Sequence, residues 1–294
     1  MLLRPTSWLA ILAISFLLFQ TACTDRPENL LRPCERCEIY LHDGLERSYV
    51  LHVPDNLPDN APLVFFLHGY GGKAHQYAWF FQIRDWADEN GFAVVVPQGT
   101  LDANRDPFWD ARLTFANIDD VGFLTGLAQE LQVTYNLDPE KTFTSGISNG
   151  GFMSYVLVQE RPEVWKAAAS LIGTMPGYSW ENRDMFVPTP LLQLSLEDDE
   201  TVPIDGSMDT TGGWGGAPHM DDIIEFWTEL NGTTEVEVLN PNDHTVGQRY
   251  TGGPEDLDVW YYKVDGFPHD VPRKGWDGTD PFPLMWEFFS LYTD

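Results

Sequence analysis

The sequence predicts an α/β protein whose central sheet is mostly parallel and is covered by helices on both faces. Short apolar runs, such as Leu63–Leu67 and residues 93–96, have the length and composition of strands that are buried on both faces. These runs alternate with segments of helical periodicity. The 294 residues, 43% of them hydrophobic, can bury a substantial core, and no break in composition or internal repeat marks a second domain.

Each expected element rests on a local pattern. Residues 76–90 have helical periodicity and stop at Gly91, which favours a single helix. In residues 119–135 apolar side chains recur at helical spacing, and the acidic pair Asp119 and Asp120 is expected to cap this helix. By the same reasoning, strands are expected at residues 39–40, 47–53, 63–67, 93–96, 141–146, 167–172, 191–196, 235–239, 248–251 and 259–264, and further helices at residues 150–160, 221–230 and 280–292.

Residues 1–23 have the pattern of an export signal. Arg4 is their only charged residue, and an apolar run covers residues 8–19. This run is too short to span a bilayer comfortably and has the length of a signal-peptide core. It ends in Gln-Thr-Ala-Cys, which resembles a bacterial lipoprotein cleavage site with Cys23 as the lipid-bearing residue, although an aliphatic residue is usual where Gln20 stands.

We therefore expect a signal peptide over residues 1–23, a polar linker over residues 24–38 and one folded domain over residues 39–294. The protein is expected to be extracellular, periplasmic or an outer-membrane lipoprotein. In the linker, Cys34 and Cys37 form a Cys-x-x-Cys pair, but a zinc site would need two more ligands and a redox motif would adjoin a strand-helix unit. For an exported protein a local disulfide is the favoured interpretation.

The composition is strongly acidic. The formal net charge at pH 7 is −28, from 45 acidic and 17 basic residues. Such a surface repels the nucleic-acid backbone and argues against nucleic acid as a partner. The charge says little about a substrate, because acidic surfaces also serve solubility.

Residues 146–150 read Gly-Ile-Ser-Asn-Gly between an expected strand and an expected helix. In this context Gly-x-Ser-x-Gly is typical of a sharp turn that exposes a strained serine above a sheet. The glycines avoid clashes with the neighbouring strand and helix. The pattern predicts that Ser148 is a nucleophile, and the flanking elements disfavour the alternative of an ordinary glycine-rich turn.

A serine hydroxyl needs a general base that takes its proton. Three histidines follow Ser148 in the chain: His219, His244 and His269. We favour His269, because it comes just after the strand expected at residues 259–264 and a loop can bring it beside the serine. The other two remain alternatives.

The base in turn needs an acidic residue that orients it, expected just past the strand at residues 191–196. Four candidates crowd this loop, namely Glu197, Asp198, Asp199 and Glu200, and the sequence alone does not separate them cleanly. We favour Asp199, which precedes a Val-Pro pair by three residues. Its neighbours are expected to be solvated acidic side chains.

Attack on an ester carbonyl creates an oxyanion, which needs preorganised N–H donors. One expected donor is the backbone N–H of Asn149, directly after the candidate nucleophile. We assign the other to the backbone N–H of Tyr70, in the glycine-rich loop that follows the strand at residues 63–67. His68 opens this loop and precedes the serine, so we expect it to brace the loop rather than to act as the base.

Two irregular segments, residues 97–118 and 205–218, are rich in Gly, Asp, Trp and Phe and are expected to overhang the site. We expect Trp109 and Trp214, which these segments carry, to contact substrate. Aromatic platforms suit a phenolic acyl group, a sugar or a polyester surface alike. The alternative is that the rings only pack the loops.

Five ordered motifs carry a resemblance to a known family. They are His-Gly-x-Gly-Gly at residues 68–72, Asp-Asp-Val-Gly-Phe at 119–123, Asp-Pro-Glu-Lys at 138–141, Gly-Ile-Ser-Asn-Gly-Gly-Phe-Met at 146–153 and Asp-Glu-Thr-Val-Pro at 199–203. With these motifs the chain, from about Ile39 to its end, resembles the secreted polyhydroxybutyrate depolymerase and feruloyl esterase family. The resemblance implies an α/β-hydrolase fold and a serine esterase with the residues assigned above.

Two features depart from the family pattern. The family often has Gly-Gly-His-x-Trp-Pro around the histidine, whereas residues 267–272 read Phe-Pro-His-Asp-Val-Pro, which leaves the substrate contacts open but not the base. The family also often carries a cysteine after an Asn-Gly pair. Here Thr233 stands at that position and no cysteine follows Cys37, so a disulfide found in relatives is absent.

The sequence thus predicts an exported serine esterase that forms an acyl-enzyme and hydrolyses hydroxyalkanoate oligomers or feruloyl and other aryl esters. No metal or organic cofactor is expected, and the oligomeric state is not predicted. No serine- and threonine-rich linker or polymer-binding module follows the catalytic region, which favours soluble esters or oligomers over solid polymer. The alternatives are a non-catalytic binding protein on a hydrolase fold and a serine peptidase.

Overall fold

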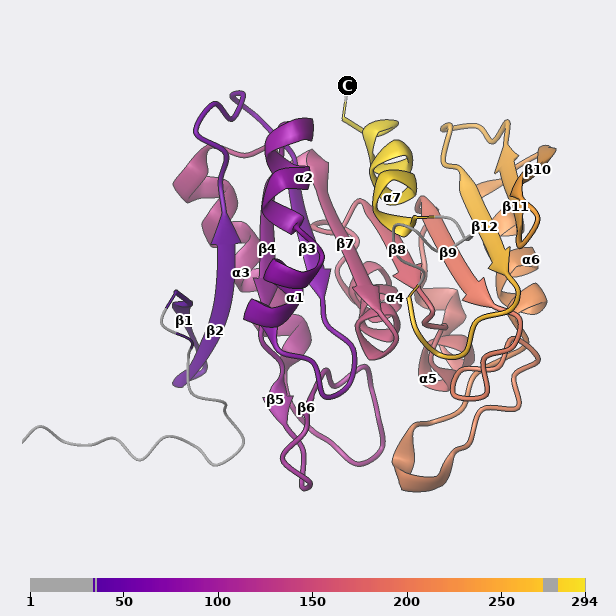
Figure 1. Cartoon of the computed structure of the whole chain (residues 1–294), viewed down its shortest axis with the longest axis horizontal. Coiled ribbons are helices and arrows are strands. Elements are labelled where there is room, and N and C mark those ends of the chain that lie inside the picture. Colours follow the sequence, from indigo (N-terminus) through magenta and orange to yellow (C-terminus); the bar gives the residue numbers. More distant parts are fainter. Residues whose placement is uncertain (1–33, 35, 272–279, 294) are drawn as a thin grey trace, which may run out of the picture.

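The structure of the protein, a computed structural model, describes residues 34, 36–271 and 280–293. Its main strands are β1 (Glu38–His42), β2 (Leu45–His52), β3 (Leu63–Leu67), β4 (Ala93–Pro97), β7 (Thr142–Ile147), β8 (Ala167–Leu171), β9 (Leu191–Leu196), β10 (Glu235–Asn242), β11 (Thr245–Thr251) and β12 (Val259–Val264). Within the described residues these ten strands form one sheet, in the order β1-β2-β4-β3-β7-β8-β9-β12-β11-β10 (Figure 1). The six central strands, β4, β3, β7, β8, β9 and β12 in sheet order, are parallel to one another, which confirms the predicted, mostly parallel sheet. The strands at both edges pair antiparallel.

Helices cover the sheet on both faces, as predicted. They are α1 (Ala74–Phe80), α2 (Ile83–Asn90), α3 (Asp120–Tyr135), α4 (Asn149–Glu160), α5 (Gly177–Glu181), α6 (Met220–Asn231) and α7 (Pro281–Ser290). In Figure 1, α1, α2 and α7 lie in front of the sheet, and α3, α4 and α6 lie behind it. Alternate residues of β3 serve the two layers: Leu63, Phe65 and Leu67 pack on the α3–α4 side, and Val64 and Phe66 pack on the opposite side.

The parallel strands deliver their following loops to one edge of the sheet. The arrowheads of β7, β9 and β12 point toward the same edge in Figure 1. In a parallel sheet the carboxyl ends of the strands lie together, and this is where α/β proteins place their sites. The loops after β3, β7, β9 and β12 therefore meet at this edge.

One predicted helix is two helices in the structure. The sequence predicts a single helix over residues 76–90, but α1 and α2 are separated by a turn in which Gln82 has a left-handed φ of 50°. The buried side chains explain the break. Ala78 of α1 and Ile83 of α2 both face the sheet, although five positions along a continuous helix would point them about 140° apart.

The two acidic residues before α3 have different roles. Asp119 is the N-cap and accepts a hydrogen bond from the N–H of Gly122 at 2.9 Å, as predicted. Asp120 is fully buried and pairs with the guanidinium of Arg47 at 2.6 Å, so the prediction that both residues cap the helix is wrong for Asp120. The ring of Phe123 lies under the same guanidinium, with 4.0 Å between Cζ of Arg47 and the ring centroid.

The other expected elements lie within a few residues of their observed bounds. The expectations did not include α5 or the small ribbon of β5 (Thr100–Leu101) and β6 (Pro107–Phe108), which lies inside one of the irregular segments. All three elements are short, so they bury too few side chains to give a periodic pattern.

The expectations about the N-terminus fall largely outside the described residues. These are the export signal over residues 1–23, Cys23 as a lipid-bearing residue and most of the linker over residues 24–38. Cys34 and Cys37 do form the expected disulfide. None of the helices in the described ranges has the length and hydropathy that crossing a membrane requires.

Candidate active site

The turn between β7 and α4 has the geometry that the Gly-x-Ser-x-Gly pattern predicts. Ser148 has φ 53° and ψ −116°, a strained conformation for a residue with a side chain. A Cβ atom on Gly146 would lie 2.4 Å from the backbone of Gly150, and one on Gly150 would lie 2.3 Å from the carbonyl oxygen of Leu67. The two glycines therefore allow the strand, the turn and β3 to approach one another closely enough to present the serine.

Three side chains from three loops lie in a line at this edge. Nε2 of His269, in the loop after β12, is 2.9 Å from Oγ of Ser148. Nδ1 of His269 is 2.6 Å from Oδ2 of Asp199, in the loop after β9. A carboxylate only accepts, so Nδ1–H donates to Asp199 and Nε2 is left to accept the serine proton. This arrangement can deprotonate the serine hydroxyl.

Asp199 is held as a buried carboxylate. Its second oxygen, Oδ1, accepts backbone N–H bonds from Thr201 and Val202, each at 2.8 Å. Burial works to raise its pKa, but the hydrogen bonds from His269 and from the Val202 N–H outweigh burial, and the pKa of Asp199 lies below its ordinary value. The group therefore stays charged beside His269.

Glu200 lines the same pocket as Ser148, but the two alternative histidines and Asp198 lie elsewhere. His219 is the N-cap of α6, and His244 bonds to Asp265 at 2.6 Å in an exposed hairpin turn. Of the acidic neighbours, Asp198 accepts the N–H of Gly266. The structure brings none of these groups to the serine.

The two expected oxyanion donors border the serine. Asn149 begins α4 directly after Ser148, and the loop of Tyr70 comes so close that a Cβ on Gly69 would lie 3.6 Å from Cβ of Ser148. Within the described ranges, the backbone N–H groups of Tyr70 and Asn149 donate to no other backbone carbonyl. An N–H group that has no partner at the start of a helix is suited to receiving an anionic oxygen.

His68 braces the Tyr70 loop from inside the protein. It is fully buried, and burial lowers its pKa to about 4, so it is neutral at pH 7. Its Nδ1–H donates to the carbonyl of Gly69 at 2.8 Å, and its Nε2 accepts the N–H of Gly99 at 2.9 Å. This agrees with the expected role of His68 as a loop brace.

A pocket of about 980 Å³ opens over the serine. Ser148 and His269 form part of its wall, and Trp214 lies on the wall as the sequence analysis expects. The remaining wall is largely apolar. It includes Trp79 and Phe80 of α1, which we did not expect from the sequence, although an aromatic run on a helix edge could have marked them.

A second, smaller hollow adjoins the first. It measures about 450 Å³, and both hollows include Tyr70 and Trp214 in their walls. The rings of these two residues meet edge to face with centroids 5.3 Å apart, and the Tyr70 hydroxyl donates to Asp102 at 2.6 Å. The pair thus forms a wall between the two hollows.

The structure corrects the expectation for Trp109. Its side chain is 0% exposed and does not line the pocket, so it cannot contact a substrate as an overhanging platform. Instead, its indole N–H donates to the carbonyl of His68 at 2.9 Å. No local pattern indicates this burial, because the segment that carries Trp109 reads as an irregular surface loop.

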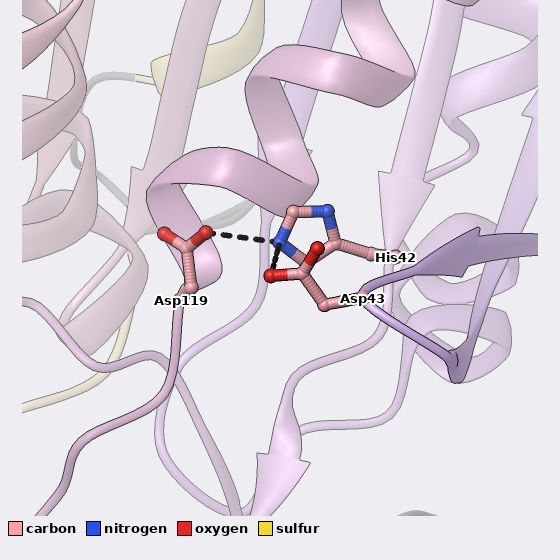
Figure 2. A group of neighbouring side chains, drawn as sticks. All are labelled: His42, Asp43 and Asp119. Carbon is pink, nitrogen blue, oxygen red and sulfur yellow. Dashed lines mark hydrogen bonds and ion pairs between the residues drawn. The ribbon is translucent and has the colours of Figure 1, made fainter.

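Figure 2 shows a cluster of side chains of the kinds that can ligate a metal, His42, Asp43 and Asp119, which lies outside the pocket. Both carboxylates approach Nε2 of the imidazole. His42 Nε2–H donates to Asp119 at 3.0 Å, and Asp119 also accepts the N–H of Gly122 at the start of α3. Burial acts to raise the pKa of Asp119, but these two hydrogen bonds hold that pKa below its ordinary value. The positive end of a helix favours the carboxylate and disfavours a cation, so we assign the cluster to fastening the β1–β2 hairpin onto α3.

Comparison with known proteins finds similarity to esterases. Residues 47–186 match a family model described as Esterase PHB depolymerase. An acetylxylan esterase of Coprinopsis cinerea is 34% identical over 149 residues, which are 49% of this chain and 39% of that protein. A probable feruloyl esterase C of Aspergillus niger is 27% identical over 256 residues, 85% of this chain and 86% of that protein.

Solved structures show the same fold. An acetyl xylan esterase from Aspergillus awamori superposes with a TM-score of 0.64 at 16% identity, over 86% of this chain and 98% of that one. The chain spans less than half of the length of the first curated relatives that it matches, 39%, 48% and 35%. Residues 47–186, which include Ser148, Tyr70 and Asn149, therefore match the PHB depolymerase esterase family, and the sheet to which they contribute has an α/β-hydrolase fold.

Proposed function

We propose that this protein is an exported serine esterase that hydrolyses carboxylic esters through an acyl-enzyme. One observation carries the proposal: a single imidazole, that of His269, lies within hydrogen-bond distance of both Ser148 and the buried carboxylate of Asp199. A pocket opens directly onto the serine. The match of residues 47–186 to an esterase family and the similarity to proteins named as esterases also support ester hydrolysis.

In the first half of the proposed reaction, Oγ of Ser148 attacks the ester carbonyl while its proton passes to Nε2 of His269. Asp199 accepts the Nδ1–H bond and stabilises the imidazolium that forms. The backbone N–H groups of Tyr70 and Asn149 receive the oxyanion. His269 then protonates the leaving alkoxide, the C–O bond breaks, and the acyl group remains on Ser148.

In the second half, water attacks the acyl-enzyme. His269 takes a proton from the water, the same two N–H groups hold the second oxyanion, and the serine leaves with the proton from His269. The products are an alcohol, released in the first half, and a carboxylic acid. The machinery requires only side chains and backbone groups of this chain.

For substrate we propose hydroxyalkanoate oligomers or feruloyl and other aryl esters. The pocket volume of about 980 Å³ accommodates more than an acetyl group, and its aromatic lining, including Trp79, Phe80 and Trp214, suits planar or apolar acyl groups. The family description and the name of the feruloyl esterase relative point to the same two classes.

We further propose that residues 1–23 direct export, that residues 24–38 are a linker, and that the catalytic domain covers residues 39–294. A lipid on Cys23 would hold the enzyme at a membrane surface. Mass spectrometry of the mature N-terminus, compared between the natural chain and Cys23→Ser, distinguishes a lipid-bearing cysteine from cleavage without a lipid.

The Ser148→Ala variant tests the catalytic proposal. Hydrolysis of a short nitrophenyl ester should fall by about five or more orders of magnitude relative to the natural enzyme, because the nucleophile is lost. Ser207→Ala, an exposed serine, is the matched control and should keep full activity. A fluorophosphonate probe should label the natural enzyme and the control but not Ser148→Ala.

The same assay separates the alternatives. Retention of ester hydrolysis by Ser148→Ala would rule out the proposed mechanism. A natural protein that is inactive and not labelled by the probe would indicate a non-catalytic binding protein. A panel of feruloyl methyl ester, 3-hydroxybutyrate oligomers, acetylated xylan and peptide anilides then ranks the substrate classes. Faster turnover of the anilides would indicate a peptidase.

A further inference from the structure

The two proposed oxyanion donors come from segments far apart in the sequence, and one residue bonds to both segments. Trp109 donates its indole N–H to the carbonyl of His68, two residues before Tyr70, at 2.9 Å. Its backbone N–H donates to Oδ1 of Asn149 at 2.7 Å. Its backbone carbonyl accepts from Nδ2 of Asn149 at 3.0 Å. A single residue therefore sets the distance between the Tyr70 loop and the start of α4.

These bonds lie in the protein interior. Trp109 and His68 are 0% exposed, and Asn149 is 1% exposed. Water cannot replace a buried hydrogen bond that breaks, so the groups are costly to separate. The indole also packs against the imidazole of His68 with ring centroids 4.9 Å apart, which restrains the ring that braces the Tyr70 loop.

Trp109 is itself fixed through its neighbour. The backbone N–H of Asp110 donates to Oδ2 of Asp120 at 2.7 Å, and the other oxygen of Asp120 accepts from the guanidinium of Arg47 at 2.6 Å. Arg47 and Asp120 are buried, with 1% and 0% exposure. A buried ion pair with additional hydrogen bonds is rigid, because a partner that moves leaves a charge unpaired.

The contacts then close into a ring. The guanidinium of Arg47 also donates to the backbone carbonyl of Gln98 at 3.4 Å. The side chain of Gln98 donates to Nε2 of His68 at 3.0 Å. His68 is also the residue whose carbonyl accepts the indole N–H of Trp109, so the network closes on itself. Both oxyanion segments are thus anchored to one buried network rather than to separate loops.

We propose that Trp109 is a positioning residue that fixes the two oxyanion donors relative to each other. The inference rests on the proposed function, because it concerns the same oxyanion. Two N–H groups must converge on one oxygen atom, and donor geometry decides how well the developing charge is stabilised. Without the indole bond the Tyr70 loop can shift independently of Asn149, so transition-state stabilisation falls while substrate binding in the pocket is kept.

The test compares Trp109→Phe with Trp227→Phe. Phenylalanine keeps a buried ring but removes the indole N–H. Trp227 is a matched control, because it is also 0% exposed and also donates its indole N–H to a backbone carbonyl, that of Thr189, at 2.7 Å. Trp227 lies on α6 and does not line the pocket.

For Trp109→Phe we expect kcat for a nitrophenyl ester to fall about tenfold with KM changed less than about twofold. The inhibition constant of phenylboronic acid, whose tetrahedral serine adduct places an oxygen at the donors, should rise by a similar factor. Trp227→Phe should keep both values and change only the melting temperature. Unchanged kcat and inhibition constant in Trp109→Phe would overturn the inference.

Asn149→Ala provides a second route if Trp109→Phe does not fold. It keeps the Asn149 backbone N–H but removes both side-chain bonds to Trp109, and we expect the same loss of kcat and of boronic acid affinity. An unchanged kcat and an unchanged inhibition constant of phenylboronic acid in Asn149→Ala would count against the inference. Activity in the natural enzyme and in Trp227→Phe, with none in Ser148→Ala, shows that the proposed function stands, so either negative result bears on the positioning role alone.

Discussion

Two histidines of this protein make the same bond to an aspartate in very different surroundings. His269 and His244 each place Nδ1 2.6 Å from a carboxylate oxygen, of Asp199 and Asp265 respectively. The Asp199 side chain is 1% exposed, whereas that of Asp265 is 50% exposed. Only His269 has the serine hydroxyl at its second nitrogen.

The difference shows that a short histidine-carboxylate contact does not by itself mark a catalytic pair. Asp199 accepts two further N–H bonds and lies at the edge where the parallel strands end. Asp265 and His244 share a hairpin region that water reaches, where such a pair contributes little. His42 and Asp119 in Figure 2 are a third pair, at a helix start. Burial, further donors and a nucleophile separate the first pair from the others.

Replacing each histidine should give the largest difference in activity between the two histidine-aspartate pairs. His269→Ala should lower kcat/KM for a nitrophenyl ester by about four orders of magnitude or more, because the serine loses its base. His244→Ala should leave kcat/KM unchanged within about twofold. Steady-state kinetics on both variants check this. A large loss in His244→Ala together with an active His269→Ala would transfer the role of base to His244.

Replacing the carboxylates should give a smaller contrast. Asp199→Asn keeps the size of the side chain but removes the charge and can favour the wrong imidazole tautomer, so kcat should fall by about three to four orders of magnitude. Asp265→Asn should retain kcat. The measurement is kcat for both variants, with circular dichroism to verify folding. Equal kcat in the two variants would mean that the buried carboxylate does no more than the exposed one.

Local sequence patterns predicted the parts of the site that are built locally. The turn around Ser148 is specified by two glycines between a strand and a helix, and each glycine is required by a backbone contact within that unit or with β3. The order serine, acid, histidine is usual for this kind of fold, and parallel strands whose carboxyl ends share an edge bring the three loops together. The choice of Asp199 among four acidic neighbours rested on spacing alone, and its two backbone donors are visible only in the folded chain.

Tertiary contacts account for what the sequence did not predict. The segment that carries Trp109 has a composition typical of an exposed loop. Only the folded chain shows that Trp109 is buried between the oxyanion segments. The left-handed Gln82 that splits residues 76–90 has no glycine or proline to mark it. Asp120 reads as a capping residue until Arg47, 73 positions away, is found beside it. In each case packing in the folded chain overrides the local pattern.

A fully buried imidazole, that of His68, extends the comparison to pH. Unlike His269 it has no carboxylate partner, and burial lowers its pKa from 6.5 to about 4. Above pH 6.5 it is neutral in both the folded and the unfolded chain. Between pH 6.5 and about 4 the unfolded chain binds a proton that the folded one does not, so the free energy of unfolding decreases as the pH falls, by up to about 3 kcal/mol.

Urea denaturation at pH 7.0, 5.5 and 4.5 measures this loss. His68→Gln, which keeps a hydrogen-bonding side chain but cannot titrate, should be less stable than the natural protein at pH 7.0 and should depend less on pH across this window. His244→Ala, which removes an exposed imidazole and leaves His68 in place, is the control and should retain the natural slope of stability against pH. Identical slopes in His68→Gln and the natural protein would mean that the acid sensitivity arises from carboxylates and not from the brace beneath the Tyr70 loop.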